Sequence, residues 1–281
     1  MKIAVLSGKG GTGKTMVAVN LAAVAQEVVY LDCDVEEPNG RLFLELEATE
    51  EQTVKVTIPQ IKADLCIGCR KCVDFCRFNA LALIEEKAVL FPDVCHPCGG
   101  CELLCPVGAV SQQEKIVGYV EKGIIANGKI YTGVLKLGEE SGVPIIRELV
   151  AKSKQEEAKL TIIDCPPGSA CVVMESIQDA DYCLLVAEAT TFGQHNLAMV
   201  YELSKLFGKP CGVVLNKCFT EENPSEEFCL EHHITILERL TYDEEIGRIN
   251  GKGGILAKEK AIYAQRFRQL LARIEKEVSC L

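Results

Sequence analysis

Residues 8–15 read Gly-Lys-Gly-Gly-Thr-Gly-Lys-Thr, and this stretch decides the fold. It fits the pattern G-x-x-x-x-G-K-S/T, follows an apolar run at residues 2–7 and opens a helical pattern at residues 15–26, which is the context that the pattern requires. Glycines let backbone N–H groups close around phosphate oxygens, and the start of the helix adds its positive dipole end. The stretch therefore predicts a phosphate-binding loop in which Lys14 reaches the β- and γ-phosphates of a nucleotide and Thr15 ligates Mg²⁺.

Outward from the loop, apolar runs alternate with helical patterns. The runs are rich in Val, Ile and Leu, as expected for strands that are buried on both faces. This alternation predicts βαβ units and an α/β fold in which helices cover a parallel sheet. The predicted strands are residues 2–7, 28–32, 160–165, 182–187, 211–216 and 234–237, and the predicted helices are residues 15–26, 143–157, 194–207 and 257–278.

The alternation breaks off in the middle of the chain, where cysteines crowd together. Four of them recur 29 positions later in the same spacing, so we expect two half-domains related by a pseudo-two-fold axis. We predict a discontinuous domain, residues 1–55 and 115–281, interrupted by an inserted α+β domain, residues 56–114. The repeated cysteines are Cys66, Cys69, Cys72 and Cys76, matched by Cys95, Cys98, Cys101 and Cys105.

Composition narrows the class of protein. The chain has 16 cysteines among 281 residues, and its first residues run into the phosphate loop without the pattern of a secretory signal. In a reducing cytosol, clustered cysteines indicate metal binding rather than disulfides, so we expect a cytoplasmic protein. The formal net charge of −10 disfavours nucleic acid and stable membrane association.

The cysteine spacing C-x₂-C-x₂-C-x₃-C is that of bacterial ferredoxins with two [4Fe–4S] clusters, in which the fourth cysteine of each run serves the other cluster. Zinc is the alternative, although it typically takes two well-separated C-x₂-C pairs. One departure from the ferredoxin pattern is Arg77, which follows Cys76 where a proline is expected, whereas Pro106 follows Cys105. The departure leaves the local geometry and the reduction potential open. The predicted ligands are Cys66, Cys69, Cys72 and Cys105 for the first cluster, and Cys76, Cys95, Cys98 and Cys101 for the second.

Lys9 gives the loop the form K-G-G-T-G-K-T, which resembles the deviant Walker A loop of the MinD/Mrp superfamily of P-loop ATPases. With its cysteine-rich insert, the chain is similar to a MinD-type ATPase that contains an inserted ferredoxin domain. The resemblance implies that Lys9 crosses a dimer interface to the partner's nucleotide, so ATP binding would produce a homodimer. The implied nucleotide-binding residues are Gly8, Lys9, Gly10, Gly11, Thr12, Gly13, Lys14, Thr15 and Met16.

Further roles are implied by the same resemblance. Asp34, after the second predicted strand, would position Mg²⁺ and the attacking water, and Asp164, at the end of an apolar run, would be the Walker B aspartate. Lys9 and Lys14 complete the implied catalytic set. A strand-end aspartate is also often a helix cap. Asn216 corresponds to an asparagine that contacts adenine in the family, the alternative being a turn-forming asparagine.

Eight cysteines lie outside the two runs. Cys183 and Cys211 fall in apolar strands, where a buried structural thiol is expected. Cys171 follows Asp164 by seven residues, a layout similar to that of the nitrogenase iron protein. We therefore treat Cys171 as a hypothetical cluster ligand at the dimer interface. The alternative is a packed thiol near residues 166–168, Pro-Pro-Gly, which resemble switch II of the family.

Three functions remain open from these parts. The first is ATP-gated electron transfer to a partner protein, driven by a slow, partner-stimulated ATPase with Mg²⁺ and two [4Fe–4S] clusters. The second is assembly or delivery of an iron–sulfur or mixed-metal cofactor, although the C-terminal half lacks the C-x-x-C pair of Mrp-type relatives. The third is spatial partitioning, as in MinD. That function needs a membrane or DNA contact, and we expect the C-terminal helix to pack on the sheet instead.

Overall fold

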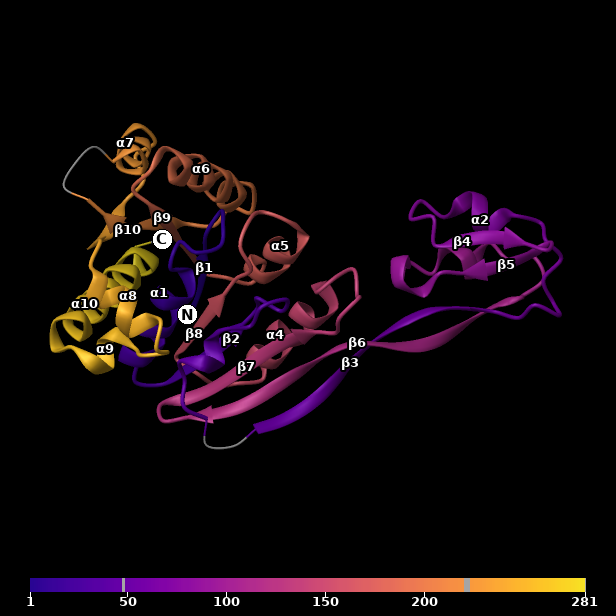
Figure 1. Ribbon diagram of the computed structural model, residues 1–281, viewed down its shortest axis with the longest axis horizontal. Coiled ribbons are helices and arrows are strands. Elements are labelled where there is room, and N and C mark those ends of the chain that lie inside the picture. Colours follow the sequence, from indigo (N-terminus) through magenta and orange to yellow (C-terminus); the bar gives the residue numbers. More distant parts are fainter. Residues whose placement is uncertain (47–48, 220–222, 281) are drawn as a thin grey trace.

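A nine-stranded sheet forms the body of the protein, and a two-stranded ribbon extends from it to a smaller part of the chain (Figure 1). The computed structural model describes residues 1–46, 49–219 and 223–280. The strands of the sheet are β1 (Lys2–Leu6), β2 (Val28–Asp32), β3 (Thr49–Ile61), β6 (Val110–Ile125), β7 (Gly128–Leu135), β8 (Leu160–Asp164), β9 (Tyr182–Glu188), β10 (Cys211–Cys218) and β11 (Ile236–Thr241). Their order is β11-β10-β9-β1-β8-β2-β7-β6-β3.

The sheet is mixed, with parallel pairing dominant. All neighbours from β11 to β7 pair in parallel, whereas β6 pairs antiparallel with both β7 and β3. The predicted α/β fold with a parallel sheet is therefore confirmed, and an antiparallel edge is added to it. The edge strand β3 contains Pro59, which lacks an N–H and is tolerated where one side of a strand is unpaired.

Helices cover both faces of the sheet. One face carries α1 together with α8, α9 and α10, and the other carries α4, α5, α6 and α7. A separate apolar core lies under each group. The helices of the body are α1 (Lys14–Val24), η1 (Gly40–Leu42), α4 (Val143–Lys154), α5 (Cys171–Ile177), α6 (Thr191–Leu206), α7 (Pro224–Glu231), α8 (Glu244–Asn250), α9 (Leu256–Glu259) and α10 (Ala261–Ser279).

The C-terminal helical pattern forms two helices, α9 and α10, with a break at Lys260. The apolar stripe of α10 is buried at Phe267, Leu270 and Ile274, which belong to the core that also contains α1. The stripe therefore packs on the body, as expected. Across the described ranges, none of the helices combines the length and the apolar character needed to cross a membrane.

The ribbon consists of β3 and β6, which run from the sheet into the cysteine-rich part (Figure 1). Both domain boundaries predicted from the sequence lie inside these strands, at residues 55–56 in β3 and 114–115 in β6. The pairing shifts register between Val54 and Lys55, next to the first boundary, and such a bulge bends and twists the strand locally. The elements beyond the ribbon are α2 (Lys71–Phe75), β4 (Leu81–Ile84), β5 (Lys87–Leu90), η2 (Pro92–Val94) and α3 (Gly100–Leu103).

The 29-residue repeat is visible in the strand pairing. Ile61 on β3 pairs with Val110 on β6, and Leu90 on β5 pairs with Leu81 on β4. Adding 29 to 61 gives 90, and subtracting 29 from 110 gives 81. Each pair is thus the repeat counterpart of the other, which is the relation expected of two half-domains around a pseudo-two-fold axis.

Candidate nucleotide site and cysteine-lined cavities

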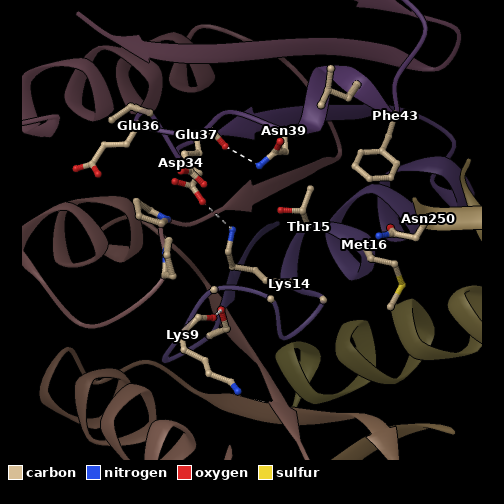
Figure 2. A pocket seen from close by; sticks show the side chains of 18 of the residues that line it. Lys9, Lys14, Thr15, Met16, Asp34, Glu36, Glu37, Asn39, Phe43 and Asn250 are labelled. Atoms are coloured by element: carbon tan, nitrogen blue, oxygen red, sulfur yellow. Dashed lines mark hydrogen bonds and ion pairs between the residues drawn. The ribbon is translucent and has the colours of Figure 1, made fainter. Parts of the chain in front are cut away.

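A cavity of about 670 Å³ lies at the carboxyl ends of β1, β2 and β8. Its walls come from the phosphate loop, the segment from Asp34 to Asn39, the pair Pro166-Pro167, and Asn250 at the end of α8 (Figure 2). The carboxyl edge of a parallel sheet is the usual place for a nucleotide. The cavity is therefore the candidate nucleotide site.

The loop is held from behind by the end of β10. The Asn216 side-chain amide donates to the Thr12 carbonyl at 2.7 Å, and Lys217 Nζ donates to the Gly11 carbonyl at 2.8 Å. Gly13 has φ +94°, and a Cβ there would lie 2.3 Å from Asn216 Nδ2, so both conformation and space require glycine. Asn216 is buried behind the loop and does not line the cavity; its adenine contact stays a prediction.

The loop fits a phosphate group. Gly10, Gly11, Gly13 and Lys14 line the cavity at the start of α1, where backbone N–H groups and the helix dipole favour an anion. Thr12 Oγ1 is buried and has no hydrogen-bond partner among the described residues. Thr12 does not line the cavity, so the fit to a phosphate rests on the glycines, Lys14 and the start of α1.

Lys14 is the central cation of the site (Figure 2). Its Nζ lies 2.6 Å from Asp164 Oδ1 and 3.9 Å from Asp34 Oδ2, and the Tyr30 hydroxyl donates to Asp164 Oδ2 at 2.8 Å. Burial alone would lower the pKa of Lys14, but the charge and hydrogen bond of Asp164 outweigh it and raise that pKa. The ammonium is therefore kept charged against Asp164, at the wall of the cavity.

The two aspartates after β2 lie in different surroundings. Asp32 is fully buried, its Oδ2 accepts from the Gly40 N–H at 2.7 Å, and burial followed by the charge of Asp164 raises its pKa well above the usual range. Asp34 lines the cavity, and burial raises its pKa to about 6 against the opposing charge of Lys14. Asp32 is thus a structural group, whereas Asp34 faces the space in which a metal–nucleotide complex would lie.

Of the predicted Mg²⁺ ligands, Thr15 and Asp34 both line the cavity, and Asp164 lies behind them against Lys14. The structure therefore places Asp34 and Asp164 beside Lys14, and Figure 2 shows Thr15 and Asp34 near the Lys14 side chain. Their roles as ligands stay predictions. Hydroxyl and carboxylate oxygens are the donor types that Mg²⁺ takes, so the residues present fit the ion.

Lys9 points away from Lys14 (Figure 2). Its Nζ lies 2.6 Å from Glu188 Oε2 and 5.0 Å from the centre of the Phe192 ring, and Lys217 Nζ lies 2.6 Å from Glu188 Oε1. Glu188 ends β9 and its side chain is only 12% exposed. In this single chain Lys9 is therefore held within its own subunit by a carboxylate that two lysines share.

One end of the cavity was not predicted from the sequence. Phe43 and Asn250 line it beside Met16 (Figure 2), and Asn250 Oδ1 is buried without a hydrogen-bond partner among the described residues. The glycine-rich turn at residues 251–254 is the sequence signal that could have indicated this wall, since glycines permit close backbone approach to a ligand.

The eight clustered cysteines surround two further cavities. Each cavity is lined by one of the two predicted ligand sets, including the fourth cysteine from the other repeat. The second cavity has a volume of about 230 Å³, whereas the first is closed down to about 20 Å³, so its walls would have to separate to admit a cluster. The first set is Cys66, Cys69, Cys72 and Cys105, and the second is Cys76, Cys95, Cys98 and Cys101.

Backbone N–H groups point at two of these sulfurs. The Ala88 N–H donates to Cys66 Sγ at 3.5 Å and, with that of Gly68, lowers the pKa of the Cys66 thiol. Burial raises the pKa of Cys105, but donors that include the Ala109 N–H, at 3.2 Å, outweigh it and lower that pKa. The thiolate is the form that binds metal, so these contacts favour ligation.

The arrangement of the cysteines bears on the choice between clusters and zinc. Thiolates are ligands for both iron–sulfur clusters and zinc, so the donor type does not distinguish the two. Each set combines a C-x₂-C-x₂-C run with the fourth cysteine of the other run, which is the arrangement of two-cluster ferredoxins. This exchange of the fourth cysteine favours iron–sulfur clusters over the zinc alternative.

The remaining cysteines differ in exposure. Cys171 is exposed at the first residue of α5 and does not line the nucleotide cavity, so its role as an interface ligand stays a prediction. Cys183 is fully buried, and burial raises its pKa to about 11. Cys211 is partly buried, and burial raises its pKa to about 12. Both are un-ionised packing thiols at neutral pH, as expected.

Comparisons with known proteins agree with this geometry. An uncharacterized protein of Methanocaldococcus jannaschii is 33% identical over 225 residues, which cover 77% of this chain and 78% of the relative. The cell division ATPase MinD of Pyrococcus furiosus superposes with a TM-score of 0.60 at 20% identity, covering 98% of each chain; this likeness shows the fold.

Two shorter similarities concern iron–sulfur proteins. A 7Fe ferredoxin of Hydrogenibacillus schlegelii is 35% identical over 63 residues, covering 20% of this chain and 81% of the ferredoxin. An iron–sulfur cluster carrier protein of Pyrococcus abyssi is 49% identical over 53 residues, covering 17% of this chain and 18% of the carrier.

The phosphate loop, the acidic strand ends and the helix-covered parallel sheet are all parts of one nucleotide-binding domain. The family described as the CobQ/CobB/MinD/ParA nucleotide binding domain matches residues 3–256, which is most of the chain. This chain is therefore a member of the CobQ/CobB/MinD/ParA family, with a MinD-like P-loop fold and a ferredoxin-like part.

Proposed function

We propose that this chain is an ATPase whose nucleotide-dependent homodimerisation controls electron transfer to a partner protein through two [4Fe–4S] clusters. The observation that carries the proposal is that two paired strands, β3 and β6, join the body with its phosphate-loop cavity to the part that contains two four-cysteine cavities. We assign nucleotide binding to residues 1–55 and 115–281 and redox chemistry to residues 56–114. We place the protein in the cytoplasm, since clustered thiols that are free to bind metal need a reducing compartment.

The nucleotide chemistry is assigned to the residues around Lys14. In this proposal Lys14 leaves Asp164 to contact the phosphates of ATP, and Asp34 orients the attacking water from the cavity wall. Thr15, Asp34 and Asp164 would hold Mg²⁺, which when bound neutralises charge on the phosphate oxygens. The release of Lys14 would change the surroundings of Asp164 when nucleotide binds. Asp164 begins the stretch 164–168, in which we take residues 166–168 as switch II.

The clusters are assigned to the two cysteine sets. When bound, they would supply one-electron redox chemistry. The chain's own contribution is to exclude water and to aim N–H groups at the ligating sulfurs. Buried Cys72 and Cys101, with the N–H donors to Cys66 and Cys105, make that contribution. Exclusion of water and hydrogen bonds to the sulfurs both influence the reduction potential of such clusters.

The test is anaerobic iron and sulfide analysis of the full chain, with EPR of the dithionite-reduced protein and phosphate release assayed in the same preparation. We expect about eight irons per chain, as two four-iron clusters require. We also expect the EPR signal or midpoint potential to change when Mg-ATP is added. Zinc in place of iron would overturn the cluster assignment. Eight irons whose EPR signal and midpoint potential stay the same with Mg-ATP would overturn the coupling.

Cofactor assembly or delivery is the second candidate function. The observation in its favour is the local 49% identity to a protein named as an iron–sulfur cluster carrier. A carrier gives its cluster away, whereas an electron-transfer protein keeps it. Incubating the iron-loaded chain with an apo-ferredoxin and Mg-ATP distinguishes the two, because only a carrier loses iron to the acceptor.

A further inference from the structure

A partly buried lysine on the ribbon contacts both the body and the cysteine-rich part. Lys115 lies on β6, and its Nζ is 2.9 Å from Glu139 Oε2 in the segment between β7 and α4. The same Nζ donates to the Pro92 carbonyl at 3.0 Å and lies 3.4 Å from Asp93 Oδ1. The side chains of Lys115 and Glu139 are 17% and 9% exposed, whereas that of Asp93 is 81% exposed. Glu139 and the Pro92 carbonyl are thus the partners that matter, because exposed ion pairs contribute little.

On the far side of Lys115 lies the second cysteine set. Pro92 begins η2, which leads directly into Cys95, and the Cys95 N–H donates to the Pro92 carbonyl at 3.4 Å. Cys95 and His96 line a cavity of about 30 Å³ together with Glu139 and Pro144 of the body. A ligand loop of the second set therefore packs against the segment that precedes α4.

On the near side lies the nucleotide cavity. The Leu135 N–H donates to the Val35 carbonyl at 2.8 Å, and Val35 directly follows Asp34. A Cβ at Gly142 would lie 2.3 Å from Val35 Cγ2 and 3.8 Å from Val172 Cγ1. Both ends of the segment 136–142 therefore lie against Val35, through Leu135 and Gly142, and Gly142 also lies near Val172 at the start of α5. Between these ends the segment is at the surface, with Leu137 98% exposed. A shift of Val35 or Val172 would displace Gly142, because these residues are packed together, and the short backbone segment would carry that displacement to Glu139.

The first cysteine set has no comparable connection. Within the described ranges, no hydrogen bond or ion pair runs from residues 64–72 to the body. Lys87 Nζ donates to the Cys66 carbonyl at 2.6 Å, and Arg70 pairs with Asp74, so both contacts stay inside the cysteine-rich part. The two sets thus differ in how they are attached to the nucleotide-binding body.

We propose that residues 136–142, joined through the Glu139–Lys115 ion pair to Pro92, transmit nucleotide-dependent movement to the second cysteine set and not to the first. Lys115 is a positioning residue in this scheme. The inference rests on the proposed function for the presence of nucleotide and clusters, but it does not require that electrons are transferred. Two distant sites are coupled when both shift the equilibrium of the same structural element. In this scheme that element is the segment 136–142.

Hydrogen–deuterium exchange of the cluster-loaded chain, with and without Mg-ATPγS under anaerobic conditions, tests the transmission. In the parent chain we expect nucleotide to change exchange roughly 5-fold or more, the usual lower size of allosteric coupling, in peptides that cover residues 136–142 and 92–98. In Lys115→Met the change at 136–142 should persist and that at 92–98 should be lost. Glu139→Gln should act alike from the body side, and the double variant should lose no more than either single variant.

Lys55→Met is the matched control, because Lys55 forms a cross-strand ion pair with Glu114 on the same ribbon at 2.7 Å. Among the described residues, it forms no hydrogen bond or ion pair with residues 136–142 or with η2. The variant should respond to nucleotide as the parent does. Three results would each overturn the inference. Exchange at residues 92–98 of the parent chain could be unchanged by nucleotide, it could change in Lys115→Met as much as in the parent, or its change could be lost equally in Lys55→Met. An exchange response without any EPR response would leave the inference standing and overturn electron-transfer control.

Discussion

At the scale of single residues, the nucleotide site is organised by one buried cation among carboxylates. Lys14 neutralises Asp164, which is fully buried and lies 2.6 Å away. Removing one partner of a buried pair leaves an uncompensated charge, at a cost of about 3–5 kcal/mol. We predict that Lys14→Met destabilises the nucleotide-free chain by about that amount, and that adding Asp164→Asn restores most of it. Urea unfolding measures both.

The rate of phosphate release distinguishes a loss of stability from a loss of contact with the phosphates. Phosphate release should be lost in Lys14→Met and in the double variant alike, because neither can contact the phosphates. A double variant that is no more stable than Lys14→Met would contradict the electrostatic explanation and point to lost packing of the lysine stem.

The buried Asp32 predicts a pH dependence of stability. Its pKa is raised in the folded chain, whereas an unfolded aspartate has a pKa of about 3.9. Between those two values the folded chain holds a proton that the unfolded chain has lost, so this stabilising contribution is present at low pH and is lost as pH rises toward the folded pKa. Asp32→Asn can keep the acceptor for the Gly40 N–H without that titration.

The measurement is urea unfolding of the parent and of Asp32→Asn between about pH 5 and 7. We expect the parent to lose stability relative to the variant by up to roughly 1.4 kcal/mol per pH unit. Parallel stability curves would show that Asp32 has the same charge in both states.

At the scale of elements, the two cysteine sets exchange their fourth member across the repeat. Cys105 ends the run after α3 but lines the first cavity, and Cys76 ends the run after α2 but lines the second. We predict that Cys105→Ala and Cys76→Ala each lose about four of eight irons, from different clusters. The two remaining clusters should therefore differ in EPR line shape and potential.

Cys171→Ala is the control, because Cys171 is exposed on α5 and lies outside both cavities. It should keep all of its iron. Loss of iron from this variant would revive the interface ligand, and identical residual signals in Cys105→Ala and Cys76→Ala would refute the exchange.

The elements that the sequence predicted well are those with continuous apolar runs. β2 has the predicted bounds, and β1, β8, β9 and β10 differ from their predictions by a residue or two at their carboxyl ends. The ribbon was missed because β3 is mostly exposed along its first part, so that its side chains show no buried period. The strand β7 was missed beside it, since its glycines and lysine interrupt the apolar run.

At the scale of the whole molecule, the site was predictable wherever one local pattern carries it. The phosphate loop and the cysteine runs are such patterns. The contacts of Lys9 are not, since they depend on β1 and β9 being neighbours in the sheet. Nor could the packing of Gly142 be seen, because residues 35, 142 and 172 follow β2, β7 and β8 and meet only when these three strands lie side by side. Long-range contacts of this kind are set by topology, and a single sequence does not display topology directly.

The contact between Lys9 and Glu188 makes the last prediction, which concerns assembly. If Lys9 crosses to a partner's nucleotide, it must first leave Glu188, which holds it at 2.6 Å within its own chain. Glu188→Gln removes the charge while Lys217 keeps an acceptor. Because Lys9 is partly exposed, we assign the ion pair about 1 kcal/mol, which corresponds to roughly a 5-fold lower ATP concentration for half-maximal dimerisation. Sedimentation velocity across an ATP titration measures that midpoint.

Glu202→Gln is the control for this substitution, since Glu202 forms an exposed pair with Lys205 on α6 and should leave the midpoint unchanged. Lys9→Ala should fail to dimerise at any ATP concentration. The direction in which Glu188→Gln shifts the ATP midpoint of dimerisation shows what Glu188 does. A lower midpoint means that Glu188 restrains Lys9 in the single chain, so that ATP competes with an internal carboxylate. A higher midpoint would mean that Glu188 orients Lys9 for the partner, and the restraint would then have to be sought in the pairing of Lys14 with Asp164.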